Sequence, residues 1–149
     1  MAAVAGLVCA GLVYAYAFER GGGRPLAWQD VSAQLGPAEF PRPAGRVFGS
    51  AAELRRFLIA AMPGRTLDSP PIDFRRREAV LIATGPRSST GYAVEVGSVR
   101  EQRGRIVVHA RERTPSLGDP VAARVTYPYR LITLPRQDKP VEIIWEGRP

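Results

Sequence analysis

Few side chains in this sequence could act as an acid, a base, a nucleophile or a metal ligand. His109 is the single histidine and Cys9 the single cysteine among 149 residues. A Ser-His or Cys-His pair would therefore depend on one imidazole, and the strand pattern around His109 places it on a solvated face. The sequence contains no paired carboxylate motif, no Asp-rich calcium loop and no glycine loop that cradles a phosphate before a helix. It predicts no catalytic residue, no cofactor and no metal site.

Polar groups that could recognise a partner concentrate in residues 86–91. This segment follows one apolar run and precedes an alternating one, so we expect a loop held by two strands, where recognition residues are common on all-β scaffolds. Pro128, inside apolar surroundings, indicates a strand edge or bulge that could pair with an extended peptide. The candidate partner-binding residues are Arg87, Ser88, Ser89, Thr90, Gly91, Tyr92, Tyr127 and Tyr129.

Both segments also have a purely structural interpretation. Residues 86–91 could form a plain hairpin connection with Gly91 in a left-handed conformation, and residues 115–120 could be a simple turn. Residues 127–129 could be a strand bend without a partner. The sequence leaves both interpretations open.

One helix is predicted in the middle of the chain. Ser50 and Glu53 form a Ser-x-x-Glu capping box, apolar residues follow at helical spacing, and Pro63-Gly64 ends the pattern. The helix should bury its apolar face against a sheet and leave Arg55 and Arg56 in solvent.

The rest of the sequence predicts strands. Short segments rich in Val and Ile alternate with Gly or Pro breaks, which indicates a mainly β (α+β) fold, an antiparallel β-sandwich or barrel-like domain with one packed α-helix. Period-two alternation places Val121, Ala123, Val125 and Tyr127 on a buried face. The expected strands are residues 28–31, 46–48, 78–84, 92–99, 105–111, 121–127, 129–134 and 141–145.

Composition agrees with one globular domain and argues against nucleic-acid binding. Hydrophobic residues make up 45% of the chain, enough for a packed core. The formal net charge is +7, which could suggest a phosphate-binding surface. However, the arginines are scattered among Glu and Asp along the sequence instead of clustering, so no nucleic-acid partner is expected.

The N-terminus is an apolar segment of a different kind. Residues 2–18 carry no charge until Glu19, and the run is the length of a short membrane-spanning helix or a long signal-peptide core. We expect residues 1–18 to be a hydrophobic helix that serves as a signal peptide or membrane anchor, residues 19–45 a linker with a short first strand, and residues 46–149 a β domain. The extracytoplasmic side is favoured, although Arg20 and Arg24 after the segment favour the opposite orientation.

Several short motifs follow one another along the chain. They are Phe48-x-Ser50, Ile72-x-Phe74, Thr90-Gly91-Tyr92-x-Val94-x-Val96, Pro115-x-x-Gly118 and Thr126-Tyr127-Pro128-Tyr129. In this order they resemble the C-terminal domain of the protease complex subunit PrcB family over about residues 46–145. The loop at residues 89–92 contains one glycine where such proteins usually have Thr-Gly-Gly-Tyr.

This resemblance implies a noncatalytic, exported or membrane-tethered domain that binds a protein partner, and a protease is the partner it suggests. An alternative is a loop-based protease inhibitor, because residues 89–92 are also similar to the Thr-Thr-Gly-Tyr loop of chagasin-type cysteine protease inhibitors. The Asn-Pro that normally precedes that loop is replaced here by Arg87-Ser88.

Overall fold

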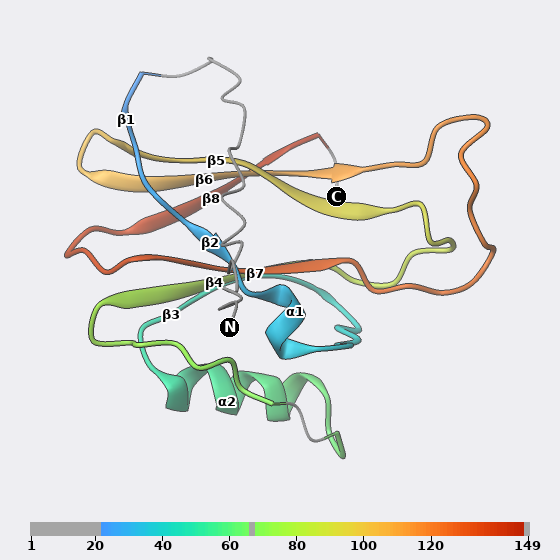
Figure 1. Ribbon diagram of the computed structural model, residues 1–149, viewed down its shortest axis with the longest axis horizontal. Coiled ribbons are helices and arrows are strands. Elements are labelled where there is room, and N and C mark those ends of the chain that lie inside the picture. Colours follow the sequence, from blue (N-terminus) through green and yellow to red (C-terminus); the bar gives the residue numbers. More distant parts are fainter. Residues whose placement is uncertain (1–21, 66–67, 148–149) are drawn as a thin grey trace, which may run out of the picture.

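The computed structural model describes residues 22–65 and 68–147, which form two β-sheets and a helical layer (Figure 1). Sheet A has the strand order β1-β5-β6-β8, and sheet B the order β2-β7-β4-β3. The elements are β1 (Arg24–Pro25), β2 (Gln29–Asp30), α1 (Ser32–Leu35), β3 (Pro43–Phe48), α2 (Ala51–Ala61), β4 (Arg77–Thr84), β5 (Ala93–Gln102), β6 (Arg105–Arg113), β7 (Tyr129–Pro135) and β8 (Val141–Glu146).

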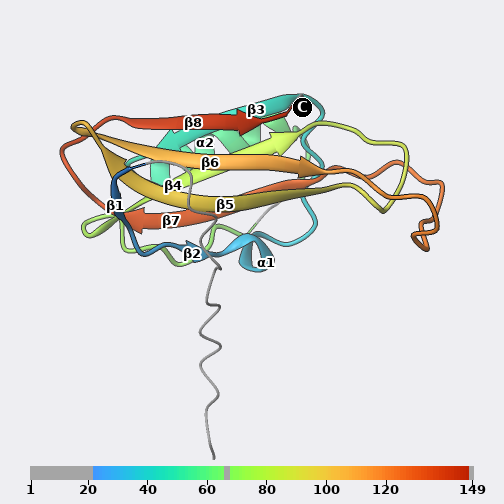
Figure 2. The same cartoon turned by 90° about the horizontal axis from the view of Figure 1, so that it is seen from above.

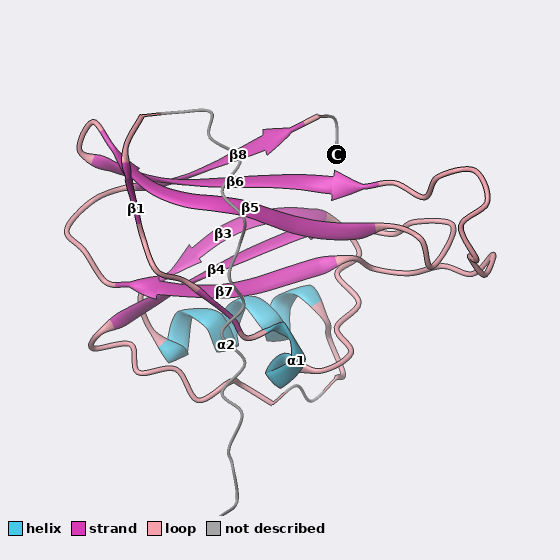
Figure 3. Cartoon of the chain, turned by 45° about the horizontal axis from the view of Figure 1, so that its top comes forward, coloured by secondary structure: helices cyan, strands magenta, loops and turns pink. Residues whose placement is uncertain are grey.

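Sheet B is the middle layer, and its strand β4 is buried on both faces. Val80 and Ile82 belong to the core between the sheets, whereas Ala79, Leu81 and Ala83 belong to the core beneath the helices. Both helices lie on the same face of sheet B (Figure 3). This double burial explains why β4 is a continuous apolar run instead of an alternating one.

Helix α2 forms as its capping signals predict. The Ser50 hydroxyl accepts the Glu53 N–H at 3.2 Å, and the Glu53 carboxylate accepts the Gly49 N–H at 2.9 Å. Leu54 and Leu58 are buried, and Phe57 packs on the same core cluster. The predicted helix is therefore confirmed, with the carboxylate bonded to the residue before the cap instead of to the cap itself.

Sheet A is mixed, so the expected antiparallel β-sandwich contains one parallel pair of strands. β8 pairs with β6 in parallel, from Ile106 opposite Val141 to Arg111 opposite Glu146. The chain reaches β8 from β7 in the other sheet through residues 136–140, so no hairpin ties its direction to β6. By contrast, β5 and β6 form a hairpin whose turn residues, Arg103 and Gly104, both have positive φ.

The two sides of the sandwich differ. On one side, residues 24–30 run from sheet A to sheet B, pairing first with β5 and then with β7. On the other side, the outer strands β3 and β8 end their sheets next to each other (Figure 2). In the part of the chain that the structure describes, β3 is hydrogen-bonded to β4 alone and so leaves one edge open.

The strand predicted at residues 121–127 does not form. This segment lies in the connection from β6 to β7 and makes only one isolated bridge, between Thr126 and Arg87. Val121 and Val125 are 42% and 62% exposed, so the buried face predicted there is also wrong. Each neighbour position that the segment could have taken beside β6 or β7 is already occupied by another strand.

The described residues include no helix with the length and apolar character needed to cross a membrane. The hydrophobic helix predicted for residues 1–18 lies outside the described residues.

Candidate partner-binding site

Two loops project together from one end of the sandwich (Figure 1). Residues 85–92 connect β4 to β5, and residues 114–128 connect β6 to β7. We call them the paired loops. Because β4 lies in sheet B and β5 in sheet A, residues 85–92 cross between sheets and do not form the hairpin connection that was one sequence interpretation.

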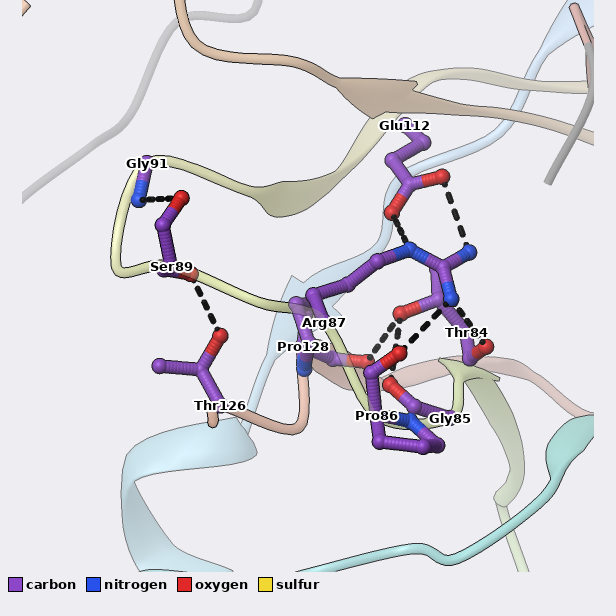
Figure 4. A network of polar contacts seen from close by, with 9 residues as sticks. All are labelled: Thr84, Gly85, Pro86, Arg87, Ser89, Gly91, Glu112, Thr126 and Pro128. Carbon is purple, nitrogen blue, oxygen red and sulfur yellow. Dashed lines mark hydrogen bonds and ion pairs between the residues drawn. The ribbon is translucent and has the colours of Figure 1, made fainter. Parts of the chain in front are cut away.

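Arg87 anchors the base of the paired loops (Figure 4). Its guanidinium binds both oxygens of Glu112, with Nη2 at 3.0 Å from Oε2, and donates through Nη1 to the carbonyls of Thr84 and Pro86 at 3.0 Å. The side chains of Arg87 and Glu112 are only 20% and 5% exposed. The hydrogen bond to Glu112 raises the pKa of Arg87 above its ordinary value. All these contacts are internal, so Arg87 holds the loop in place.

Ser89 and Thr90 join one loop to the other. The Ser89 carbonyl accepts from the Thr126 hydroxyl at 2.7 Å, and the Ser89 hydroxyl accepts from the Gly91 N–H at 3.4 Å (Figure 4). The Thr90 hydroxyl accepts from the Ala122 N–H at 3.0 Å, and the Thr90 N–H donates to the Ala122 carbonyl at 3.1 Å. These polar groups are used within the molecule and fix the shape of the paired loops.

Gly91 is required by close packing. A Cβ at this position would lie 2.5 Å from Pro115 Cβ and 2.6 Å from Val121 Cγ1. Its φ is not positive, so the left-handed conformation considered from the sequence is not adopted. Thr90 likewise has no positive φ, so the single glycine of this loop does not leave a strained residue.

The remaining predicted residues do not form one cluster. Ser88 is exposed, and Tyr92 and Tyr127 are partly buried. The Tyr129 hydroxyl donates to the carbonyls of Ser32, at 3.0 Å, and Gly36, which ties α1 to β7. Its ring packs edge-on against Phe40 with 5.3 Å between centroids, and burial raises its pKa. Tyr129 therefore supports the helical layer beneath sheet B.

Three exposed apolar side chains at the paired loops escaped the sequence analysis. Leu117 is fully exposed, and Val121 and Val125 are 42% and 62% exposed. Leu117 lies in a turn in which the Ser116 N–H donates to the Asp119 carboxylate at 2.8 Å and the Asp119 N–H donates to the Ser116 carbonyl at 3.1 Å. The signal available in the sequence was a large apolar residue inside a Pro-Ser-Leu-Gly-Asp-Pro turn, where no strand could bury it.

Groups for acid-base or metal chemistry do not gather at the paired loops. Among residues 22–65 and 68–147 no three His, Cys, Asp or Glu side chains are arranged to hold a metal ion. His109 lies on β6 in sheet A, where its Nδ1 is 3.1 Å from Glu146 Oε1. What the site offers is contact surface: ordered backbone with apolar side chains on it.

The family comparison covers this same region. The family model described as PrcB C-terminal matches residues 79–135, from β4 to β7, and so includes the paired loops. No curated protein and no solved structure matches the chain significantly. The chagasin-type alternative stays a prediction that these comparisons do not test. Residues 79–135 are therefore similar to the PrcB C-terminal family.

Proposed function

We propose that this protein is a noncatalytic binding domain that docks on a protease through the paired loops. The family match associates residues 79–135 with a component of a protease complex. One structural observation carries the assignment to the paired loops: Leu117, Val121 and Val125 are exposed on a segment whose backbone is fixed by hydrogen bonds to residues 87–90. Large apolar side chains left exposed on an ordered loop are available to pack against a partner.

The rigidity of the paired loops supports this proposal energetically. A loop that is ordered before binding loses less conformational entropy when a partner docks, so more of the contact energy appears as affinity. The internal hydrogen bonds of Ser89 and Thr90 supply that order. In this proposal they act as positioning residues, and the apolar residues make the contact.

The test is affinity capture of the tagged full chain from membranes of its own host. A Leu117→Asp, Val125→Asp variant should lose the captured protease by about tenfold or more, since charged groups at a packed interface core are strongly unfavourable. The matched control is Ile59→Asp, because Ile59 is 60% exposed on α2 in the helical layer, away from the paired loops. Equal recovery with all three chains would place the contact elsewhere, and recovery of no protease with any of them would refute the proposed function.

The proposal includes attachment to a membrane, or export, through residues 1–18. Its support is the uncharged apolar run of residues 2–18. Deleting residues 2–18 should move the protein from the membrane fraction to the soluble one if the segment is an anchor. N-terminal sequencing of the mature protein distinguishes a cleaved signal peptide, for which residues 15–17 supply a small-x-small site.

A further inference from the structure

A groove lies between the open edge of β3 and the second half of α2, and its lining residues all come from the chain between Phe40 and Pro63. It has a volume of about 750 Å³ and is lined on the β3 side by residues 41–46. Its apolar part is formed by Phe40, Ala44, Phe57 and Ala61, and Pro63 closes the end where α2 stops. No function discussed above uses this groove.

The open edge of β3 presents unpaired backbone groups beside the groove. The Thr84 N–H donates to the Pro128 carbonyl on the β7 side. Backbone N–H and C=O groups alternate in direction along a strand, so those of Ala79, Leu81 and Ala83 point toward β3. Their partners across the ladder are Phe48, Arg46 and Ala44. The N–H groups of Gly45 and Val47 therefore point away from the sheet, where an added strand could accept from them.

Alternation along β3 also decides which side chains face the groove. Ala44 and Phe48 pack against the helical-layer core, whereas a Cβ on Gly45 would meet Ile143 of sheet A at 3.3 Å. Ala44 and Arg46 therefore share the helix-side face, and Arg42, in the bend just before β3, also lines the groove. The sequence Arg42-x-Ala44-x-Arg46 places a small apolar residue between two cations along the groove.

The charge of this groove is unbalanced. Neither the Arg42 nor the Arg46 side chain has a hydrogen-bond or ion-pair partner among the residues that the structure describes. Glu39, the nearest acidic residue in sequence, already binds Arg65 at 2.7 Å. An occupant with carboxylates at both ends would complement the two guanidinium groups, which favour bidentate carboxylate binding.

We propose that the groove binds an extended acidic segment of a partner protein, which adds as a strand to the edge of β3. The segment has the pattern acidic-x-apolar-x-acidic, with its apolar side chain over Ala44 and its carboxylates on Arg42 and Arg46. The added strand is antiparallel to β3, so one intervening residue pairs with the N–H and C=O of Gly45 and the other donates its N–H to the Pro43 carbonyl. This surface adjoins the paired loops at Gly85, beside Arg42 and Pro43, but it does not include Leu117, Val121 or Val125 and does not depend on the partner proposed for them.

The probe is the labelled peptide acetyl-Thr-Glu-Thr-Leu-Thr-Glu-Thr-amide, titrated by fluorescence anisotropy into the full chain in nonionic detergent. Binding should weaken by about tenfold or more when lysine replaces both glutamates, as charge complementarity requires. N-methylation of the threonine amides next to the leucine should abolish binding, because these amides face β3. N-methylation of the glutamate and leucine amides should leave binding unchanged, because those amides face away from it.

Protein variants locate the peptide. Arg42→Glu with Arg46→Glu should weaken binding by about tenfold or more. The matched control is Arg55→Glu with Arg56→Glu, an equal charge change on exposed residues of α2 outside the groove, and it should leave binding intact. The Leu117→Asp variant should also bind normally, which separates this proposal from the function of the paired loops.

Several results would overturn the proposal. These are no binding of the parent peptide at millimolar concentration, equal binding of the lysine peptide, or equal loss with both N-methylated peptides. Concentration-dependent dimers that the Arg42, Arg46 variant abolishes would also overturn it, because they would assign the β3 edge to a second copy of the chain. So would binding of anionic lipid vesicles without binding of the peptide. Because the N-methylated series uses the wild-type protein, the test does not depend on the folding of any variant.

Discussion

Arg87 illustrates how a polar loop residue can serve structure instead of recognition. The sequence places it among candidate contact residues, since a loop arginine beside serines offers several donors. In the folded chain its donors are directed at Glu112 and at the carbonyls of Thr84, which ends β4, and Pro86. Glu112 belongs to β6 in the other sheet, so the ion pair ties sheet B to sheet A at the base of the paired loops.

Replacing Arg87 should therefore destabilise the fold. Arg87→Met leaves the Glu112 carboxylate nearly buried without its partner, and we expect the free energy of unfolding in urea to fall by about 2 to 4 kcal/mol. Arg105→Met is the matched control: Arg105 binds Glu142 at 2.7 Å, but both side chains are about half exposed. That change should cost no more than about 1 kcal/mol. Equal effects of the two substitutions would contradict the anchoring role of Arg87.

Glu78 is a second residue whose environment departs from what its type suggests. It lies in β4 with its Oε1 buried and without a hydrogen-bond partner among the described residues. Burial raises its pKa above the ordinary value, and the positive charge of Arg136 partly opposes this shift. Because the folded state binds the proton more tightly than the unfolded chain does, the protonated form stabilises the fold.

The sign of this effect predicts a pH dependence for Glu78→Gln. The stability that protonated Glu78 contributes is fully present below its unfolded pKa of about 4.5 and is lost as pH rises through the higher folded value. Glutamine has no proton to lose, so the variant should gain stability relative to wild type between about pH 4 and pH 7. Urea unfolding of both proteins at the two pH values measures the difference, in which the other carboxylates cancel. A relative gain by the wild type over that range would refute the prediction.

Residues whose roles are local could be predicted, and those whose roles depend on distant chain could not. Ser50 and Glu53 are three positions apart, and the predicted cap forms. The requirement for glycine at position 91 arises from Pro115 and Val121, which reach it only after β5 and β6 have folded. No pattern within residues 86–92 carries that information.

At the scale of elements, the same distinction separates correct from incorrect predictions. The segments now seen as α2, β3, β4, β5, β6, β7 and β8 were each recognisable from hydrophobic periodicity and turn residues. Residues 121–127 show the same alternation but remain a loop, because neither sheet has an unoccupied position next to β6 or β7. The parallel direction of β8 was also hidden, since it follows from a crossover between sheets.

The segment before β3 contributes more to the core than a linker usually does. Leu26 packs between the two sheets, whereas Val31, Leu35 and Phe40 pack in the helical-layer core. Burial of one such side chain stabilises a fold by about 1.5 to 3 kcal/mol. Losing all four would remove an amount comparable to the total stability of a small domain, which is about 5 to 15 kcal/mol.

A truncation series should show this dependence. A chain that begins at Gly22 should give dispersed amide resonances and a cooperative thermal transition, because it retains every described element. A chain that begins at Arg46 should give neither, because it lacks the four core side chains and the strands that cover β5 and β7. A folded, cooperative domain from residue 46 onward would show that the preceding segment is dispensable.

At the scale of the whole molecule, the fold separates its candidate contact surfaces. Residues 24–30 cover one side of the sandwich, the paired loops project from one end, and the β3 edge with its arginine-lined groove is open on the other side. The family match spans the strands that support the paired loops and stops short of β3 and β8. The paired loops therefore lie in the part of the chain that matches the family model.

The account rests on contact between the paired loops and a protease, and site-specific photo-crosslinking tests this most directly. A photoreactive amino acid would replace Leu117 in one full-length protein and Ile59 in another, each expressed in the native host, illuminated and analysed by mass spectrometry. We predict a light-dependent adduct with a protease at position 117 and none at position 59. An adduct of equal yield at both positions, or a position 117 that forms no adduct with a protease, would contradict the account.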